Sequence, residues 1–318
     1  MNYLKAIVLV LFIALFEGAL AQSFPIKPVR IILPYSSGGE GDAVLRAITA
    51  RLFDKWKQPV LIDFRPGAGS IIGTDMAAKA NPDGYTILFT SNGFITSQFG
   101  QQPLPYDPAS LLPLARATIS PLILYVNSQL PIKTLNDLVA YGKPRPRQLM
   151  FGSAGIGSSP HLTAELFAAV NGMEITHVPY KGTGPARVDL LGGRLQGYWG
   201  TSLIMPSAAE TQVRAIAVAN SKRLTGFPDL PTTAEMGMPG IVAASWTGFF
   251  LPAKVPAELQ DRIHADLMEI LNTPEFRETI LRFRMESATL SREEYAAFLK
   301  GEYRKWGDLI RTRNIRIE

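Results

Sequence analysis

The stretch that decides the fold reads Phe151-Gly152-Ser153-Ala154-Gly155-Ile156-Gly157-Ser158-Ser159-Pro160-His161. Its small residues let the backbone pass close to a ligand, and Ser159 before Pro160 is typical of a helix N-cap and first turn. Apolar residues at helical spacing follow it, namely Leu162, Leu166, Phe167 and Val170. Because unpaired N–H groups and the positive end of the helix dipole meet at a helix start, the stretch predicts an anion site. The alternative is an ordinary turn between a strand and a helix.

A second stretch of this kind lies early in the chain and reads Pro34-Tyr35-Ser36-Ser37-Gly38-Gly39-Glu40-Gly41-Asp42. The apolar residues 29–33 run into it, and apolar residues at helical spacing follow it. Asp42 lies where an N-cap is expected, and it either only caps the helix or also fixes the shape of an anion loop. Two such loops in one chain favour the anion interpretation over two unrelated turns.

Strands and helices alternate along the chain, with glycine-containing turns between them. Strands are predicted at residues 29–33, 60–64, 85–89, 149–151, 175–179, 195–199 and 214–219. The alternation predicts an α/β fold in which each of two lobes is a mostly parallel sheet flanked by helices. Two further apolar runs, 122–126 and 245–251, are interpreted as crossings between the lobes, and a lobe that is interrupted and resumed produces a hinged cleft.

The predicted division of the chain follows from these crossings. It gives a signal peptide at 1–21, the first part of lobe 1 at 22–122, lobe 2 at 123–221, and a return to lobe 1 with C-terminal helices at 222–318. Thr273 before Pro274 predicts one helix start, and Ser291 with Glu294 forms a capping box at another. The aromatic residues of these helices are predicted to be core.

The first residues have the form of a secretory signal. One lysine precedes a wholly apolar run at residues 6–16, and a small-x-small pattern predicts cleavage after Ala21. The run is too short to span a bilayer comfortably, although a retained anchor is the alternative. The mature protein is therefore expected outside the cytoplasm, in the periplasm of a cell that has one.

Composition narrows the chemistry. The chain has no cysteine, which excludes a disulfide, a thiolate metal site and a lipid-modified N-terminal cysteine. Its net charge of +5 suits anionic small molecules but is also common in exported proteins. The densest basic run, Lys143-Pro144-Arg145-Pro146-Arg147, contains two prolines and no aromatic residue. It predicts a solvated loop, so no nucleic-acid partner is expected.

Three other polar stretches can contribute to a site. Gly67, Gly69 and Gly73 resemble a dinucleotide fingerprint, but the spacing is wrong by one residue and no acidic residue follows at the expected distance, so a tight turn explains them. Ser91 and Asn92 follow a strand, where open α/β sheets bind ligands. Tyr180-Lys181-Gly182 can reach an anion, and its alternative is a turn with a surface lysine.

Seven motifs occur in an order that resembles a known family. They are Pro34-x-x-x-Gly38-Gly39-x-x-Asp42, Arg65-Pro66-Gly67-Ala68-Gly69, Pro82-Asp83-Gly84-Tyr85-Thr86, Leu104-Pro105-Tyr106-Asp107-Pro108, Gly152-Ser153-x-Gly155-x-Gly157-Ser158-x-x-His161-Leu162, His177-Val178-Pro179-Tyr180-Lys181-Gly182 and Ser245-Trp246-x-Gly248. Together they resemble the substrate-binding proteins of tripartite tricarboxylate transporters, the Bug-type periplasmic receptors. The resemblance extends from about Phe24 to Ile310.

The resemblance implies a two-lobed periplasmic binding protein fold, type II-like, that closes on a small carboxylate without a cofactor or metal. Backbone amides of the two loops would hold the carboxylate, which is expected to be a di- or tricarboxylate or an aromatic carboxylate. The implied ligand-binding residues are Tyr35, Ser36, Ser37, Gly38, Gly39, Asp42, Gly67, Ala68, Ser91, Asn92, Ser153, Gly155, Gly157, Ser158, Ser159, His161, Tyr180, Lys181, Gly182, Gly200 and Thr201. The implied partners are the membrane permease subunits of such a transporter, and a monomer is expected.

Three positions depart from the family pattern and bear on specificity. Ser37 replaces the usual proline, Phe64 replaces a polar residue, and Gly200-Thr201 stands where an aspartate commonly follows the strand. Without that carboxylate a ligand amine lacks a partner, so an amino-acid ligand is disfavoured and a further carboxylate or an aromatic end is easier to accommodate. Phe64, residues 91–94 and residues 199–202 are predicted to decide what is attached to the bound carboxylate.

A receptor fits the residue inventory better than an enzyme does. The only histidines are His161, His177 and His264, without metal-ligand spacing, and no stretch has the Gly-x-Ser-x-Gly pattern. The closest approach to a hydrolase is Ser158 or Ser159 near His161. The alternatives to a transport receptor are therefore a ligand sensor for a signalling partner and a serine-dependent hydrolase.

Overall fold

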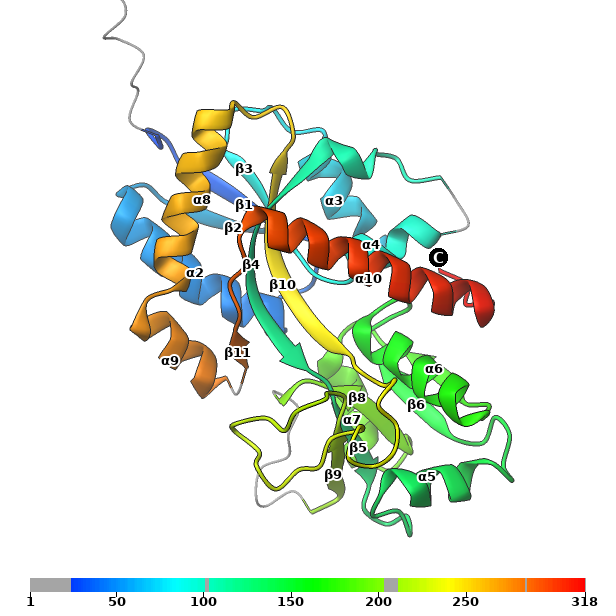
Figure 1. The fold of residues 1–318 in the computed structure, drawn as a ribbon. Coiled ribbons are helices and arrows are strands. Elements are labelled where there is room, and N and C mark those ends of the chain that lie inside the picture. The colour runs from blue at the N-terminus through cyan, green and yellow to red at the C-terminus, as the bar shows by residue number, and fades with distance from the viewer. Residues whose placement is uncertain (1–23, 101–102, 203–210, 284, 318) are drawn as a thin grey trace, which may run out of the picture.

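The computed structural model describes residues 24–100, 103–202, 211–283 and 285–317. The predicted signal peptide lies outside these residues. Two lobes lie one above the other in Figure 1, each built on one β-sheet. Along the described part of the chain, no helix is long and apolar enough to cross a membrane.

The first lobe is built on a six-stranded sheet with the order β11-β4-β10-β3-β1-β2. Its strands are β1 (Val29–Leu33), β2 (Val60–Phe64), β3 (Thr86–Thr90), β4 (Leu111–Pro121), β10 (Ala244–Pro252) and β11 (Glu286–Ser287). Its helices are α2 (Glu40–Trp56), α3 (Ile71–Ala78), α4 (Gly93–Thr96), α8 (Ala257–Leu271), α9 (Pro274–Arg282) and α10 (Arg292–Thr312). The central strands are apolar and buried, as strands covered on both faces must be.

The second lobe is built on a five-stranded sheet with the order β7-β6-β8-β5-β9. Its strands are β5 (Ile123–Asn127), β6 (Met150–Ser153), β7 (Thr176–Pro179), β8 (Gly197–Gly200) and β9 (Val213–Val218), and its helices are α5 (Leu135–Gly142), α6 (Ser159–Asn171) and α7 (Thr183–Leu191). Leu224 and Leu230 pack on its apolar cluster, and Thr232 forms a bridge with Val218. The division of the chain at residues 122 and 221 stays a prediction.

The two-lobed α/β fold predicted from the sequence is confirmed, but both sheets are mixed rather than mostly parallel. β1 pairs in parallel with β2 and β3, and β6 pairs in parallel with β7 and β8. Antiparallel pairs come from β4, β5 and β10. β4 runs directly into β5 of the other sheet, because only Leu122 separates the two strands. No crossover helix lies between them to turn the chain back into a parallel direction.

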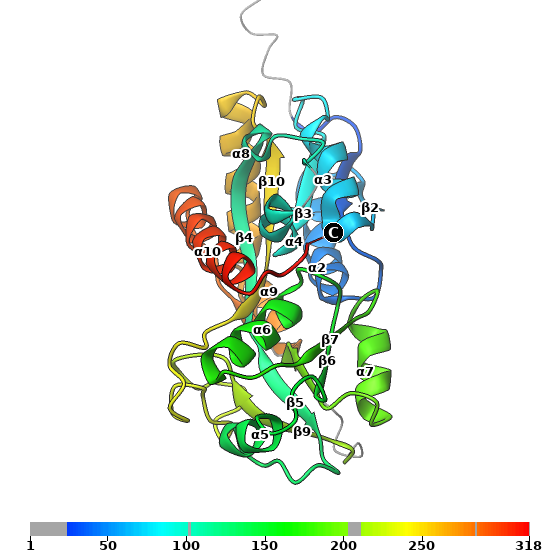
Figure 2. The ribbon, with the colours of Figure 1, turned by 90° about the vertical axis from the view of Figure 1, so that its right-hand side faces the viewer.

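The two lobes meet at a short hinge. The Leu122 N–H donates to the Ala243 carbonyl at 3.0 Å, the Ala243 N–H donates to the Ala219 carbonyl at 2.9 Å, and the Ala219 N–H donates to the Leu122 carbonyl at 2.7 Å. Figures 1 and 2 show β4 and β10 side by side as they approach this point. The hinge is therefore a pair of connections held together by backbone hydrogen bonds.

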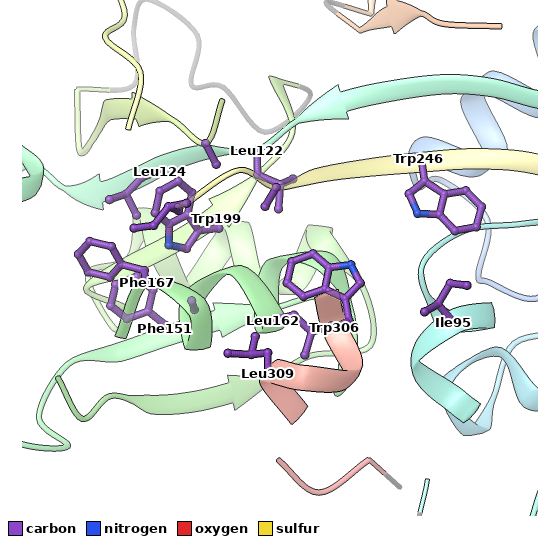
Figure 3. Close-up of a cluster of buried hydrophobic side chains, with 14 of the residues drawn as sticks. Ile95, Leu122, Leu124, Phe151, Leu162, Phe167, Trp199, Trp246, Trp306 and Leu309 are labelled. Carbon is purple, nitrogen blue, oxygen red and sulfur yellow. The ribbon is translucent and has the colours of Figure 1, made fainter. Parts of the chain in front are cut away.

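One hydrophobic cluster extends across both lobes (Figure 3). Phe151, Phe167 and Trp199 belong to it in the second lobe, and Trp246 belongs to it in the first. Between them, Leu162 of α6 lies beside α10, whose Trp306 and Leu309 are buried in the same cluster. Because its buried side chains belong to a cluster shared by both lobes, α10 connects the lobes as well as covering the first sheet. Burial of each large apolar side chain contributes about 1.5–3 kcal/mol to stability.

Predicted helix starts are correct to within one to three residues. The capping box at α10 is confirmed, since the Glu294 N–H donates to Ser291 Oγ at 3.2 Å and the Ser291 N–H donates to the Glu294 carboxylate at 2.9 Å. Two N-caps were predicted wrongly. The N-cap of α6 is Ser158 rather than Ser159, and that of α2 is Gly39, which leaves Asp42 as the third helical residue.

Candidate ligand-binding site

The first loop, defined here as residues 34–42, leaves several backbone amides free. Ser36, Ser37, Gly38 and Gly39 are exposed. Of the described residues, none accepts a hydrogen bond from the amides of Ser36, Ser37 or Gly39. The loop leads into α2, a helix of 17 residues. Free N–H groups beside the positive end of a long helix can bind an anion.

The buried carboxylate of Asp42 fixes the shape of the first loop. The Gly38 N–H donates to Asp42 Oδ2 at 2.8 Å, and Asp42 Oδ1 lies 2.7 Å from Arg46 Nε. Gly38 has a φ of 83°, a left-handed conformation that favours glycine. Asp42 is only 5% exposed, so its carboxylate supports the loop and already occupies the Gly38 amide.

The second loop, defined here as residues 151–161, is hydrogen-bonded internally. The Gly155 N–H donates to Ser153 Oγ at 3.1 Å and the Gly157 N–H donates to His161 Nδ1 at 3.1 Å. The Ser158 N–H and Oγ–H both donate to the Gly155 carbonyl. These bonds use amides that the sequence nominated as ligand donors. The amides of this loop for which the described residues supply no acceptor belong to Ala154, Ile156, Ser159 and His161.

His161, the last residue of the second loop, stacks on His177 of β7. The rings of His161 and His177 are 3.6 Å apart between centroids and 13° from parallel. His177 Nε2 lies 2.6 Å from Ser153 Oγ. Burial, with the neighbouring His177, lowers the pKa of His161 to about 3, and burial lowers the pKa of His177 to about 4. Both rings are neutral at neutral pH, as His161 must be to accept the Gly157 hydrogen bond through Nδ1.

Gly157 brings the second loop into contact with the first lobe. It has a φ of 75°, and a Cβ at this position would lie 2.9 Å from Thr96 Oγ1 of α4 and 3.5 Å from Ile317 Cδ1. Real side chains do not pack at 2.9 Å without displacing a neighbour. The close approach that glycine permits here is therefore to α4, across the boundary between the lobes.

A third group of predicted residues lies after β2 and after β3 in the first lobe. Ala68 and Ser70 have positive φ angles of 46° and 88°, which cost about 1 kcal/mol or more each. Their turn packs on Gly93, where a Cβ would lie 2.6 Å from Ser70 Oγ and 2.9 Å from the Tyr35 hydroxyl. The strained turn, Tyr35 of the first loop and the residues after Ser91 thus form one assembly. Gly67, with a φ of 131°, opens this turn.

Asn92 and Ser70 are buried polar side chains of this assembly that lack a hydrogen-bond partner among the described residues, and Asn92 carries the larger group. It is 2% exposed, and neither Oδ1 nor Nδ2 has a hydrogen-bond partner among the described residues. Leaving a buried polar group unsatisfied costs about 1–3 kcal/mol. A buried amide kept at this cost is a candidate for binding a ligand or a water molecule.

The remaining predicted residues lie in the second lobe. The Tyr180 hydroxyl donates to Asp189 at 2.6 Å, which directs it toward α7, while Lys181 is exposed and Gly182 precedes α7. Gly200 and Thr201 are buried at the end of β8. The neighbouring Trp199 is fully buried in the cluster of Figure 3, so its indole is part of the core.

Glu40 lies at the end of the first loop and is a candidate that the sequence analysis did not nominate. It is the first residue of α2 and follows the free amide of Gly39. Ser120 Oγ of β4 donates to Glu40 Oε1 at 3.2 Å, and the hydroxyls of Ser245 and Thr201 lie near enough to act on the pKa of its carboxyl. Burial raises its pKa to about 7, against the opposing effect of these hydroxyls. An acidic residue inside a predicted anion loop was the available signal.

Ser158 and His161 are hydrogen-bonded to the backbone of the second loop and not to each other. Ser158 Oγ–H donates to the Gly155 carbonyl, and His161 Nδ1 accepts from the Gly157 amide. The serine that contacts a histidine is Ser153, which is fully buried. In the described residues no group of three or more His, Asp or Glu side chains could hold a metal ion.

Two lobes joined by two strands, with loops at helix starts on either side of the hinge, define a hinged solute-binding protein. Residues 44–315 match the family described as "Tripartite tricarboxylate transporter family receptor", and the chain belongs to this family of periplasmic receptors. It is 31% identical to the protein BugT of Bordetella pertussis over 306 residues, which is 94% of this chain and 93% of BugT.

Two solved structures share the fold closely. One is R. palustris Rpa4515 with adipate, with a TM-score of 0.86 and 31% identity over 92% of this chain and 99% of that chain. The other is MatC from Rhodopseudomonas palustris with bound malate, with a TM-score of 0.80 and 28% identity over 90% of this chain and 100% of that chain. Both neighbours hold a dicarboxylate.

Proposed function

We propose that this chain is an extracytoplasmic receptor that binds a small carboxylate between its lobes and delivers it to the permease subunits of a tripartite tricarboxylate transporter. The observation that carries the proposal is the set of free amides at the start of α2. Family membership supports it, as do the adipate and the malate in neighbouring structures.

The ligand carboxylate is bound by backbone amides, those of Ser36, Ser37 and Gly39 in the first lobe and that of Ser159 in the second. The residues that hold these loops in shape are Tyr35, Gly38, Asp42, Ser153, Gly155, Gly157, Ser158 and His161. The rest of the site is lined by Gly67, Ala68, Ser91, Asn92, Tyr180, Lys181, Gly182, Gly200 and Thr201. The protein acts without catalysis, after an N-terminal signal peptide has directed it to the periplasm.

Thermal unfolding of the purified mature protein with a panel of carboxylates tests this function. A ligand at a thousand times its dissociation constant stabilises the bound protein by about 4 kcal/mol, which moves the unfolding temperature by several degrees. The matched control for each acid is its primary amide, which keeps the shape and loses the charge.

The expected result is stabilisation by at least one carboxylate and none by its amide. If no carboxylate stabilises the protein, while an ester or amide is hydrolysed in a manner that depends on Ser158 and Ser159, the protein is a hydrolase. Uptake of the same carboxylate by the native host, measured with and without the chromosomal gene, then tests the transporter partnership.

A further inference from the structure

Glu40 brings a carboxyl group to the place where the two lobes meet. Three hydroxyls from three different elements lie near it, those of Ser120 at the end of β4, Ser245 at the start of β10 and Thr201 after β8, and that of Ser120 donates to it at 3.2 Å. The first two lie on the crossing strands and the third belongs to the second sheet. The carboxyl therefore lies between the lobes, one residue from the free Gly39 amide.

This carboxyl has no cationic side chain as a partner in the part of the chain that the structure describes. Among the described residues no lysine or arginine forms an ion pair with Glu40. On its own helix, Asp42 is paired with Arg46. β10 carries no ionisable residue, and Arg116 of β4 instead donates to the Ala288 carbonyl. The group that faces it from β8 is Tyr198, whose hydroxyl lies 3.4 Å from Thr183 Oγ1 and whose pKa is raised, chiefly by burial and also by Glu40.

A partly buried carboxyl without a cationic partner favours its neutral form, because loss of hydration penalises the charge. With a pKa of about 7, Glu40 carries a proton for a large part of the time at neutral pH. A neutral carboxylic acid can donate one hydrogen bond, which an ionised carboxylate cannot do. What Glu40 can offer a ligand is therefore an O–H group.

The surroundings select the partner of that O–H. Beside Glu40 lie the free N–H groups of the first loop and the positive end of α2, which are all donors. These groups attract an acceptor with negative charge and oppose an ammonium group. A second carboxylate on the ligand satisfies both the donors and the neutral acid.

We propose that Glu40 is a specificity-determining residue that pairs as a neutral acid with a second carboxylate of the ligand, so that binding of a dicarboxylate takes up a proton. The pairing forms one O–H···O⁻ hydrogen bond, the proton remains shared between the two carboxyl groups, and no covalent bond changes. This inference rests on the proposed function, since it assumes that the first carboxylate is bound by the loop amides.

Calorimetry with matched six-carbon probes tests the pairing on the full mature protein. Adipate carries the second carboxylate, hexanoate has a methyl group there, and 6-aminohexanoate has an ammonium group. Each is titrated at about pH 6.5, 7.5 and 8.5, where both adipate carboxyls are ionised. The binding enthalpy, measured in two buffers of different ionisation enthalpy, gives the number of protons taken up on binding. Glu40→Gln mimics the neutral acid, Glu40→Ala removes it, and Glu278→Gln removes an exposed carboxylate elsewhere.

For the unmodified protein we expect adipate to bind at least tenfold more tightly than hexanoate. Its affinity should fall about tenfold per pH unit above the pKa of Glu40, with uptake of nearly one proton at about pH 8.5. Glu40→Gln should keep the preference for adipate but lose the pH dependence and the proton uptake. Glu40→Ala should lose the preference, and Glu278→Gln should behave as the unmodified protein.

Each other outcome has a distinct meaning. If carboxylates bind but adipate shows no proton uptake, or if Glu40→Gln leaves the pH profile unchanged, the pairing is wrong and the proposed function stands. Tighter binding of 6-aminohexanoate than of adipate would show that Glu40 acts as an ionised acceptor, which also overturns the pairing. If none of these probes and no other carboxylate stabilises or binds the protein, the proposed function fails first.

Discussion

The first and second loops have similar sequences, but they differ in how many of their backbone amides are hydrogen-bonded within the protein. The first loop is exposed and leaves the amides of Ser36, Ser37 and Gly39 without acceptors in the described structure. The second loop binds its own amides through Ser153, His161 and the Gly155 carbonyl. Glycine and serine thus permit two different outcomes, a loop that presents its backbone and a loop that is rigid.

The difference assigns different tasks to the two lobes. In residues 36–39 of the first loop, the amide that a side chain binds is that of Gly38, which donates to Asp42, so the rest of this backbone can respond to a ligand. The second loop rests on stacked histidines behind it and on Thr96 and Ile317 in front of it. We infer that the second loop is a fixed wall and the first loop is the adjustable side of the site.

Substitution of the glycines gives the largest expected contrast between the loops. Gly157→Val places a branched side chain at a φ of 75° and against Thr96, so it should destabilise the protein by about 2–4 kcal/mol and abolish ligand binding. Gly39 has a φ of −90°, and the nearest atom to its Cβ position is 4.0 Å away. Gly39→Ala should leave stability within about 0.5 kcal/mol and weaken binding by obstructing the amides.

Urea unfolding measures the stabilities of both variants, and calorimetry measures their affinities. The matched control is Gly226→Ala, which has open space at its Cβ position. Equal stability of Gly157→Val and the unmodified protein would show that the second loop is not a rigid wall. A Gly39→Ala variant with full affinity would remove that amide from the site.

Acid should weaken the second loop before the first. The folded pKa values of His161 and His177, about 3 and about 4, lie below those of the unfolded chain. The unfolded chain therefore takes up protons first, and stability that is complete above about pH 6.5 is lost as the pH falls toward these values. Each histidine contributes a loss of about 1.4 kcal/mol per pH unit in this interval.

His177→Phe isolates this effect because it keeps a ring in the stack and removes the titration. Glu40, with its raised pKa, contributes the opposite slope between about pH 4.5 and 7, so the informative quantity is the difference between the two proteins. Urea unfolding at about pH 7, 6 and 5 should show a loss of stability that is shallower in His177→Phe by about 1.4 kcal/mol per unit. Parallel profiles would place the acid-sensitive contacts elsewhere.

The sequence predicts the strands and helices around the site better than the hydrogen bonds and close contacts within it. Apolar periodicity locates the strands and the helix starts, because burial imposes those periods locally. It cannot show that Ser153 meets His177, or that Gly157 faces Thr96, since both contacts depend on how distant segments pack. The hydrogen bond between Ser120 and Glu40 could not be predicted for the same reason, because the two residues are 80 positions apart along the chain.

Substitution of Asn92 tests whether the first lobe keeps ligand-binding groups without hydrogen-bond partners at a cost in folding stability. Its buried amide has no partner in the described structure, so Asn92→Ala removes an unsatisfied group rather than a hydrogen bond. We expect stability to change little or to rise by up to about 1 kcal/mol, while affinity for the carboxylate found by screening falls about tenfold. The paired counterpart in the second lobe is Ser153, whose hydroxyl contacts Gly155 and His177.

Ser153→Ala should show the reverse, with a loss of about 1–2 kcal/mol of stability, because it leaves the Gly155 amide and a histidine nitrogen without their partner. Urea unfolding and calorimetry of the two variants, measured side by side, decide the matter. If Asn92→Ala destabilises the protein as much as Ser153→Ala does and leaves affinity unchanged, the Asn92 amide is a structural group. The contrast between an unpaired first lobe and a paired second lobe would then be confined to the loop amides.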